Sequence, residues 1–248
     1  MAKLIWGNVV DRRYEAGVDR GVLYIDGVGI PWNGLTAVKE GHSGGQGRSY
    51  HVDGVRYANR VTLEEFEATI DAITYPEEFS ECDGTKSLGN GLFVTQQRRK
   101  PFGFAYRTMI GNDAEGLEHG YKLHLVYNAL AQPYDRTYST IGRSTEVVDF
   151  SWKIVTKPPV LDFVPTAHFV IDSRTTPDGL LSQIEDILYG SEVQDARLPS
   201  ANELAFLFTD YEVTDFDAGD PDDVVYYTFD GSAPTQGTVT TTLDGGTP

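Results

Sequence analysis

Apolar and polar residues alternate through most of the first 175 residues, in short runs separated by glycine, proline and aspartate. Alternate residues of a strand face opposite sides of a sheet, so such runs predict half-buried β-strands where they are rich in β-branched and aromatic residues. The predicted strands are residues 4–10, 21–26, 102–110, 122–130, 147–156 and 167–172. The chain is therefore expected to be mainly antiparallel β.

The segment TLEEFEATIDAITY, residues 62–75, supports two interpretations. Apolar residues from position 66 to 72 alternate with Glu65, Glu67 and Asp71, as on a strand with one acidic face. Apolar residues of the same segment also recur at helical spacing, and Thr62 with Glu65 fits a helix capping box. The β-branched content and the neighbouring strands favour the strand.

Helical signals are confined to short stretches. Thr176 can cap the first amides of a helix that has Pro177 at its first position, and Gly190 can end it. A second short helix is predicted from Ser200, because Ser200 and Glu203 have capping-box spacing. The stretch YPEEFSECDG is expected to give one further helical turn.

Two glycine-containing stretches predict a hairpin and a loop. Asp53 and Gly54 separate two short alternating runs, and both residue types tolerate the positive φ of a tight hairpin turn. The preceding stretch EGHSGGQGRS, residues 40–49, has four glycines in ten residues. This composition is typical of a flexible segment, so we expect a long, mobile loop there.

Length and charge limit the possible functions. A chain of 248 residues allows one large domain or two small ones. Its 37 acidic and 20 basic residues give a formal net charge of −17, which repels a phosphate backbone and argues against non-specific DNA binding. Ten acidic residues and no Lys or Arg follow Arg197, so the last part of the chain is electrostatically distinct.

Signals for enzymatic or metal chemistry are weak. The histidines are His42, His51, His119, His124 and His168. None has the spacing that brings two imidazoles to one metal, so we expect no metal and no cofactor. The acidic run at 215–223 lacks the glycine and glutamate of an EF-hand and reads as a solvated loop. Cys82 lies between two acids, which raise a thiol pKa, so a structural thiol is expected.

A basic cluster and a tryptophan are candidates for contacts with other molecules. Arg98, Arg99 and Lys100 form a basic cluster, for which we favour pairing with acids of a neighbouring subunit over a nucleic-acid contact or a polar loop. Trp32, in GIPWNGL, is expected to be either a loop anchor packed on its own domain or an aromatic hot spot of an interface.

Apolar runs are too short for a signal peptide or a membrane span, so we expect a soluble protein made in the cytoplasm.

Four stretches together resemble the major tail tube proteins of long-tailed, non-contractile (siphovirus-type) bacteriophages. They are GVLYIDGVGIPWNGLTAVKE (21–40), SYHVDGVRYANRVTLEEFEATIDAITYPEEFSECDG (49–84), VVDFSWKIVTKPP (147–159) and AHFVIDSRTTPDGLLSQIEDILYG (167–190). RLPSANELAFLF fits as well, so the resemblance covers residues 21 to 208 in order. No single residue of these patterns is diagnostic.

The resemblance implies a β-sandwich or partial barrel with one or two short helices, whose inner strands form a shared β-barrel on oligomerisation. It implies a non-enzymatic virion protein that assembles into rings of six, stacked into a tube through which DNA is ejected. The implied partners are further copies of the chain, a tape measure protein, and tail tip and tail terminator proteins. Viral DNA passes through without specific binding, and no membrane is involved.

The resemblance also suggests roles for particular residues. Glu65, Glu67 and Asp71 are expected to face the channel, where carboxylates would repel phosphates. Contacts between rings or subunits are expected from Trp32, Gly41, His42, Gly44, Gly45, Gly47 and Arg48.

The expected organisation is an N-terminal arm or strand at 1–20, the tube domain at 21–209, and an acidic extension with a possible hairpin at 210–248. Two other functions stay open from the residues alone. One is a phage-exterior or receptor-binding β-sandwich, and the other is a glycan hydrolase on a jelly roll.

Overall fold

The computed structural model describes residues 12–45, 47–61, 63–138, 140, 148–159 and 165–209. All described residues belong to one compact unit of the chain. The strand predicted at 4–10 and the acidic extension with its possible hairpin lie outside the described residues.

The described elements are mostly strands. The strands are β1 (Arg13–Ile25), β2 (Val28–Pro31), β3 (Leu35–Gly44), β4 (Gly47–Val52), β5 (Val55–Val61), β6 (Glu64–Ala72), β7 (Lys86–Gly89), β8 (Leu92–Val94), β9 (Phe102–Asn112), β10 (Gly116–Ala131), β11 (Phe150–Thr156) and β12 (His168–Asp172). The helices are α1 (Phe79–Cys82), α2 (Asp178–Tyr189) and α3 (Ala201–Thr209). Among them, no helix is both long enough and apolar enough to cross a bilayer. The mainly β fold class with few short helices is confirmed.

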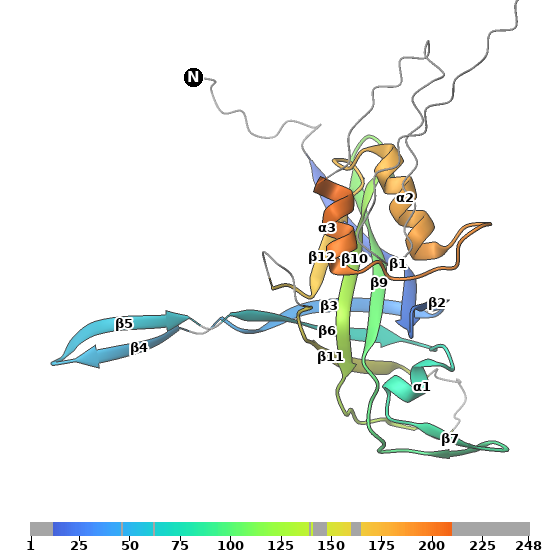
Figure 1. The fold of residues 1–248 in the computed structure, drawn as a ribbon, viewed down its shortest axis with the longest axis horizontal. Coiled ribbons are helices and arrows are strands. Elements are labelled where there is room, and N and C mark those ends of the chain that lie inside the picture. The colour runs from blue at the N-terminus through green and yellow to red at the C-terminus, as the bar shows by residue number, and fades with distance from the viewer. Residues whose placement is uncertain are drawn as a thin grey trace, which may run out of the picture. The chain divides into compact units, whose positions relative to one another are not determined.

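One antiparallel sheet organises the fold (Figure 1), in the strand order β2-β1-β9-β10-β11-β6-β3, and β12 pairs with β10. The long strand β10 pairs with β9 along one edge. Along its other edge it pairs first with β12 and then, from Ala129 to Ala131, with β11. The sheet therefore divides at β10 into a helix-covered layer (β1, β9, β10 and β12) and an open layer (β11, β6 and β3).

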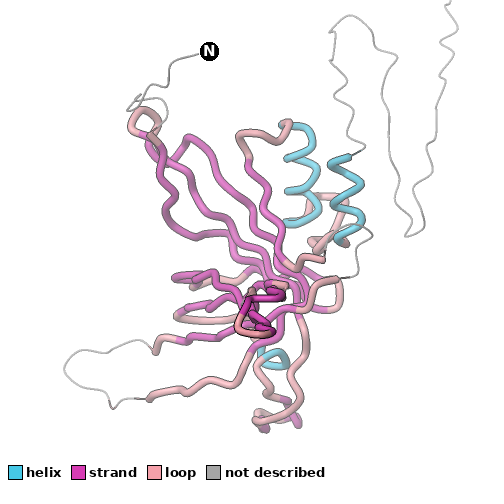
Figure 2. Tube along the Cα trace, turned by 90° about the vertical axis from the view of Figure 1, so that its left-hand side faces the viewer, coloured by secondary structure: helices cyan, strands magenta, loops and turns pink. Residues whose placement is uncertain are grey.

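Two apolar cores hold these layers. On one face of the helix-covered layer, Leu123, Leu125 and neighbouring residues pack against α2 and α3. Figure 2 shows the two longer helices on this side of the strands. On the other face, Phe104 and its neighbours pack against the open layer, whose contribution includes Ile70 and Trp152. The open layer consequently has one apolar face in the core and one face that no described helix covers.

The caps of the longer helices differ. In α3 the predicted capping box is confirmed, because the Glu203 amide donates to Ser200 Oγ (3.1 Å) and the Ser200 amide donates to Glu203 Oε2 (3.2 Å). In α2 the predicted helix is confirmed but the Thr176 cap is wrong, since the Thr176 hydroxyl donates to the Asp172 carbonyl oxygen instead. Gly190, at φ 83°, ends α2 as predicted.

Two stretches beside the hairpin form strands in the structure. Residues 64–72 form strand β6, so the helical interpretation is wrong. The expected long loop at 40–49 is also wrong, because residues up to Gly44 belong to β3 and Gly47 begins β4. Strand β6 supplies the backbone partners, pairing Gly44 with Glu64, and these hydrogen bonds outweigh the flexibility that glycine confers.

The predicted Asp53–Gly54 turn is confirmed, with φ of 51° and 77°, and it joins β4 to β5. Strand β1 continues through residue 20, so residues 13–20 form a strand of the main sheet, with register shifts between Ala16 and Asp19 and between Asp19 and Val22. The one-turn helix predicted after Pro76 is confirmed as α1.

An ion pair across β1 and β9 predicts a pH dependence of stability. Arg107 Nε and Nη2 donate to the two carboxylate oxygens of Asp19 at 2.7 and 2.5 Å. This hydrogen bonding holds the pKa of Asp19 below its ordinary value, against the opposing effect of burial. A lowered pKa in the folded state stabilises the fold above the unfolded pKa of about 3.9, and the contribution disappears as the pH falls through the folded pKa.

Asp19→Asn should therefore lower the free energy of unfolding at pH 7 by no more than about 1 kcal/mol, because the Asp19 side chain is 44% exposed. The loss relative to the unsubstituted chain should shrink as the pH is lowered below 3.9. Urea unfolding at a series of pH values measures this, with Asp195→Asn on the exposed loop after α2 as the matched control. A deficit of equal size at every pH would contradict the proposed linkage.

Candidate functional site

The outward face of the open layer carries the predicted acidic residues. Along β6, Ala68, Ile70 and Ala72 are buried in the core, whereas Glu65, Glu67 and Asp71 lie on the other face. The alternation predicted from the sequence is therefore present. The residues of this surface, called the open face below, are Lys39, Glu65, Glu67, Asp71, Ser151 and Lys153.

The open face is charge-paired rather than purely acidic. Lys39 Nζ lies 2.6 Å from Asp71 Oδ2, and Lys153 Nζ lies 2.6 Å from Glu67 Oε2. The hydrogen bond from Lys153 lowers the pKa of Glu67. Burial acts to raise the pKa of Asp71, but hydrogen bonds from Lys39 and Ser151 outweigh it, so this pKa is also lowered. Both carboxylates are thus charged and neutralised locally near pH 7.

Strand β3 forms one end of the main sheet and, among the described strands, pairs only with β6. Its outer edge presents backbone amide and carbonyl groups along a ten-residue strand. Such an edge is a template for pairing with another chain. Gly41, His42 and Gly44, expected in a contact loop, instead lie on this strand.

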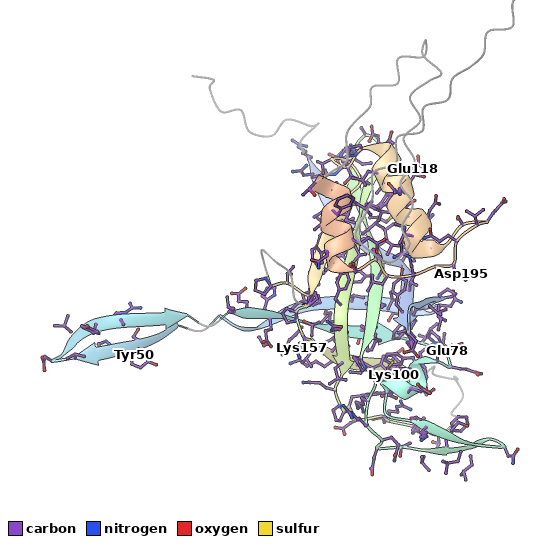
Figure 3. All side chains as sticks on the ribbon, viewed as in Figure 1. Tyr50, Glu78, Lys100, Glu118, Lys157 and Asp195 are labelled. Carbon is purple, nitrogen blue, oxygen red and sulfur yellow. The ribbon has the colours of Figure 1, made fainter. Side chains whose placement is uncertain are left out.

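The β4–β5 hairpin is a separate two-stranded sheet, and neither strand pairs with any other described strand. It follows β3 and precedes β6 in the chain, with Gly47 and Arg48 at its start. Its exposed apolar side chains include Val52, Val55 and Tyr57, which is 81% exposed, and Tyr50 on β4 is labelled in Figure 3. The hairpin therefore exposes apolar surface on a short two-stranded sheet.

Trp32 is buried within its own chain. It is 2% exposed and belongs to the core between the two layers. Its Nε1–H donates to the Thr74 carbonyl oxygen at 3.0 Å, and its ring packs against Phe79 and Phe104. These contacts favour the loop-anchor interpretation over an interface hot spot.

Two residues of the basic cluster pair with acids of the same chain. Arg99 Nη1 lies 3.2 Å from Asp83, and Lys100 Nζ lies 2.6 Å from Asp26 and 3.2 Å from Glu81. Figure 3 shows Lys100 close to α1. The short helix α1 brings Glu81 and Asp83 to these bases within the same chain, a proximity that sequence spacing does not reveal. Arg98 is exposed.

Cys82 is fully buried in the core. Burial raises the pKa of its thiol to about 12, so the thiol is a poor nucleophile near neutral pH. The expectation of a structural thiol is confirmed.

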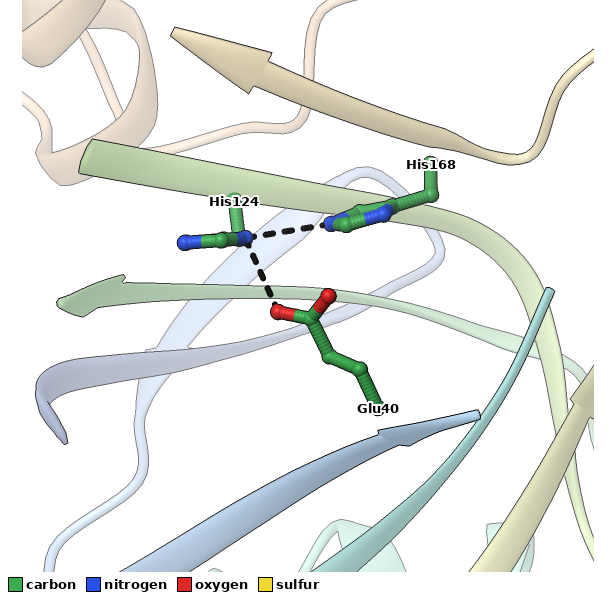
Figure 4. A group of neighbouring side chains, drawn as sticks. All are labelled: Glu40, His124 and His168. Atoms are coloured by element: carbon green, nitrogen blue, oxygen red, sulfur yellow. Dashed lines mark hydrogen bonds and ion pairs between the residues drawn. The ribbon is translucent and has the colours of Figure 1, made fainter. Parts of the chain in front are cut away.

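A second cluster, absent from the sequence prediction, joins Glu40 of β3, His124 of β10 and His168 of β12 (Figure 4). His124 Nδ1 lies 3.2 Å from His168 Nε2 and 3.3 Å from Glu40 Oε1. Burial lowers the pKa of both histidines, which are therefore neutral near pH 7. The two histidines are 44 residues apart in the sequence and have no metal-ligand spacing, but the pairing of β10 with β12 brings them together.

No protein-family model matches the chain, and no curated protein matches its sequence. Among solved structures, a chain of the extracellular contractile injection system PVC sheath–tube complex in the extended state is 12% identical, with a TM-score of 0.36; the match covers 62% of this chain and 88% of that chain. The tube-terminating cap of the anti-feeding prophage is 8% identical, with a TM-score of 0.35, covering 62% and 89%.

The PVC sheath/tube terminator in the extended state is 13% identical, with a TM-score of 0.33, covering 64% of this chain and 97% of that chain. Likenesses at these identities and scores do not assign a function to this chain.

Proposed function

We propose that this protein is a structural, non-enzymatic subunit that assembles with copies of itself into rings, which stack into a phage-type tail tube. The sequence resemblance to siphovirus-type tail tube proteins motivates the proposal. The β4–β5 hairpin is the structural observation that carries it, because a two-stranded sheet with exposed apolar side chains is marginal in water on its own. Contact with another copy would bury that surface.

Ring formation would use the sheet edges. The outer edge of β3 offers ten residues of backbone for pairing, and pairing between copies removes the aggregation hazard of an exposed edge. A head-to-tail contact of this kind closes into a ring when the rotation between neighbours permits, and we propose six copies. Stacking of rings through the hairpin would then repeat along one axis and generate a tube.

The open face would line the bore. Its three acids exceed its two lysines, and the ion pairs hold Lys39 and Lys153 on carboxylates of the same chain. The excess of acids leaves this face with a net negative charge, which repels phosphates, so DNA would pass without being held. Glu65, Glu67 and Asp71 keep their proposed channel-facing role, now with the lysines beside them.

A tail tube subunit would have a defined location and defined partners. The protein would reside in the virion, where the ends of the tube would contact tail tip and tail terminator proteins and its interior a tape measure protein during assembly. The alternative, an exterior or receptor-binding module, would use the same apolar hairpin to contact a ligand rather than another copy.

Concentration-dependent assembly of the full chain tests the proposal. Sedimentation velocity across a concentration series, with negative-stain microscopy of the same samples, should show rings that convert to tubes of one constant diameter. A receptor-binding module would instead remain a small closed oligomer. A monomer or a small closed oligomer that persists at the highest concentrations would overturn the tube assignment.

A further inference from the structure

We propose that Glu40, His124 and His168 form a binding site for a divalent transition-metal ion of the zinc class. The three side chains each offer one ligand atom, and these atoms lie within 4.8 Å of one another. Two imidazole nitrogens and one carboxylate oxygen are a donor set that zinc accepts in proteins. The site lies within one chain, so it is independent of the proposed assembly.

The distances in the cluster suit one shared ion. Zinc binds nitrogen and oxygen ligands at about 2.0–2.2 Å, so neighbouring ligand atoms of a tetrahedral site are about 3.3 Å apart. His124 Nδ1 lies 3.2 Å from His168 Nε2 and 3.3 Å from Glu40 Oε1. Both separations match, which means an ion needs little rearrangement of His124 relative to its two neighbours.

Outer hydrogen bonds hold the ligands in position. Thr108 Oγ1 lies 3.0 Å from His124 Nε2, the ring nitrogen that faces away from the cluster. When Nε2 carries the proton and donates it to Thr108, Nδ1 keeps its lone pair for a metal. The Tyr106 hydroxyl donates to Glu40 Oε1 at 2.7 Å and fixes the carboxylate. Protein metal ligands commonly have such partners.

The same hydrogen bonds allow a metal-free arrangement. In the other tautomer His124 Nδ1–H donates to Glu40, and the Thr108 hydroxyl donates to Nε2. In the metal-free arrangement a proton lies between His124 and Glu40. In the metal-bound arrangement an ion is shared by His124, His168 and Glu40. Direct measurement of metal binding therefore distinguishes them.

The cluster lies where an ion could enter from the surface and link strands of the two layers. The Glu40 side chain is 39% exposed and the His124 side chain 7% exposed, so the cluster spans from the surface into the core. The His168 ring packs on Phe66 with ring centroids 4.1 Å apart. A bound ion would tie edge strand β3 of the open layer to β10 and β12 of the helix-covered layer and so stabilise the folded chain.

The test is a titration of the full chain with Zn²⁺ after chelator treatment and desalting, in competition with a chromophoric chelator. One ion per chain should bind, and Co²⁺ should give the intense visible absorption of a four-coordinate site. The melting temperature should rise with Zn²⁺ and return to its starting value with EDTA. Glu40→Gln and His168→Asn should each weaken binding at least as much as loss of an outer hydrogen-bond partner does, about 10- to 100-fold.

Matched controls separate this site from other histidines. His51→Asn on the hairpin and His119→Asn, which removes the pair with Glu115, should leave zinc affinity and the cobalt spectrum unchanged. Circular dichroism of the Glu40 and His168 variants without metal checks that they fold. Absence of saturable binding to the unsubstituted chain, or equal affinity in folded Glu40→Gln and His168→Asn variants, would overturn the proposal.

Discussion

Trp152→Ala is expected to lower the free energy of unfolding by about 3–5 kcal/mol, the usual cost of deleting a buried aromatic side chain. Trp152 lies on β11 with no exposed surface, in the core between the two layers. Its ring is stacked on Phe150, with ring centroids 5.5 Å apart, and meets Phe79 edge-on at 5.1 Å. Loss of the indole would leave a cavity whose aromatic walls cannot collapse without moving either layer.

Urea unfolding of the purified chain measures this loss. Trp152→Phe is the matched control, because it keeps a ring at the centre of the aromatic cluster and should cost less than half as much. Domains of this size have a free energy of unfolding of only about 5–15 kcal/mol. The Trp152→Ala variant should therefore still fold, with a measurable but clearly reduced free energy of unfolding. A loss below about 1 kcal/mol would be incompatible with a close-packed core at this position.

Removal of the β4–β5 hairpin should abolish tube formation while leaving the main sheet folded. Gly44 of β3 and Glu64 of β6 are paired across the two strands, so a two-residue Asn-Gly turn can replace residues 45–63 and close the ribbon. The deletion removes the exposed apolar residues Val52, Val55 and Tyr57 together. If the hairpin provides the contact between rings, the shortened chain should form rings that no longer stack.

Negative-stain microscopy and sedimentation of the shortened chain measure the effect, with circular dichroism as the check on folding. Asp53→Asn is the matched control, because Asn-Gly retains the left-handed turn and the complete hairpin. This variant should form tubes as the unsubstituted chain does. Long tubes from the folded, shortened chain would assign ring stacking to another surface.

Local signals in the sequence were sufficient for much of the fold. Alternation predicted β9 and β10, although each strand extends beyond the predicted range. The Ser200–Glu203 capping box located the start of α3, since both partners lie within one turn. The prediction from composition was wrong at residues 40–49. The glycine content indicated a loop, but pairing with β6 makes residues up to Gly44 a strand.

The candidate surfaces were less predictable, because they depend on which strands become neighbours. Glu67 and Asp71 were correctly placed on one face of β6, but their lysine partners come from β11 and β3. The cluster of Glu40, His124 and His168 likewise requires three strands from distant parts of the chain. No spacing rule in a single sequence reports such pairings, which hydrogen-bond register determines.

The long sequence separation between paired strands has a consequence for how the chain folds. Leu23 pairs with Phe104 and Ile70 pairs with Trp152, in each case across about eighty residues of intervening chain. Contacts this distant in sequence require costly loop closure before they contribute, which places folding in the millisecond-to-second range rather than in microseconds. During synthesis the apolar side of β6 must wait for β11 to emerge from the ribosome, and this interval is when the nascent chain is most exposed to aggregation.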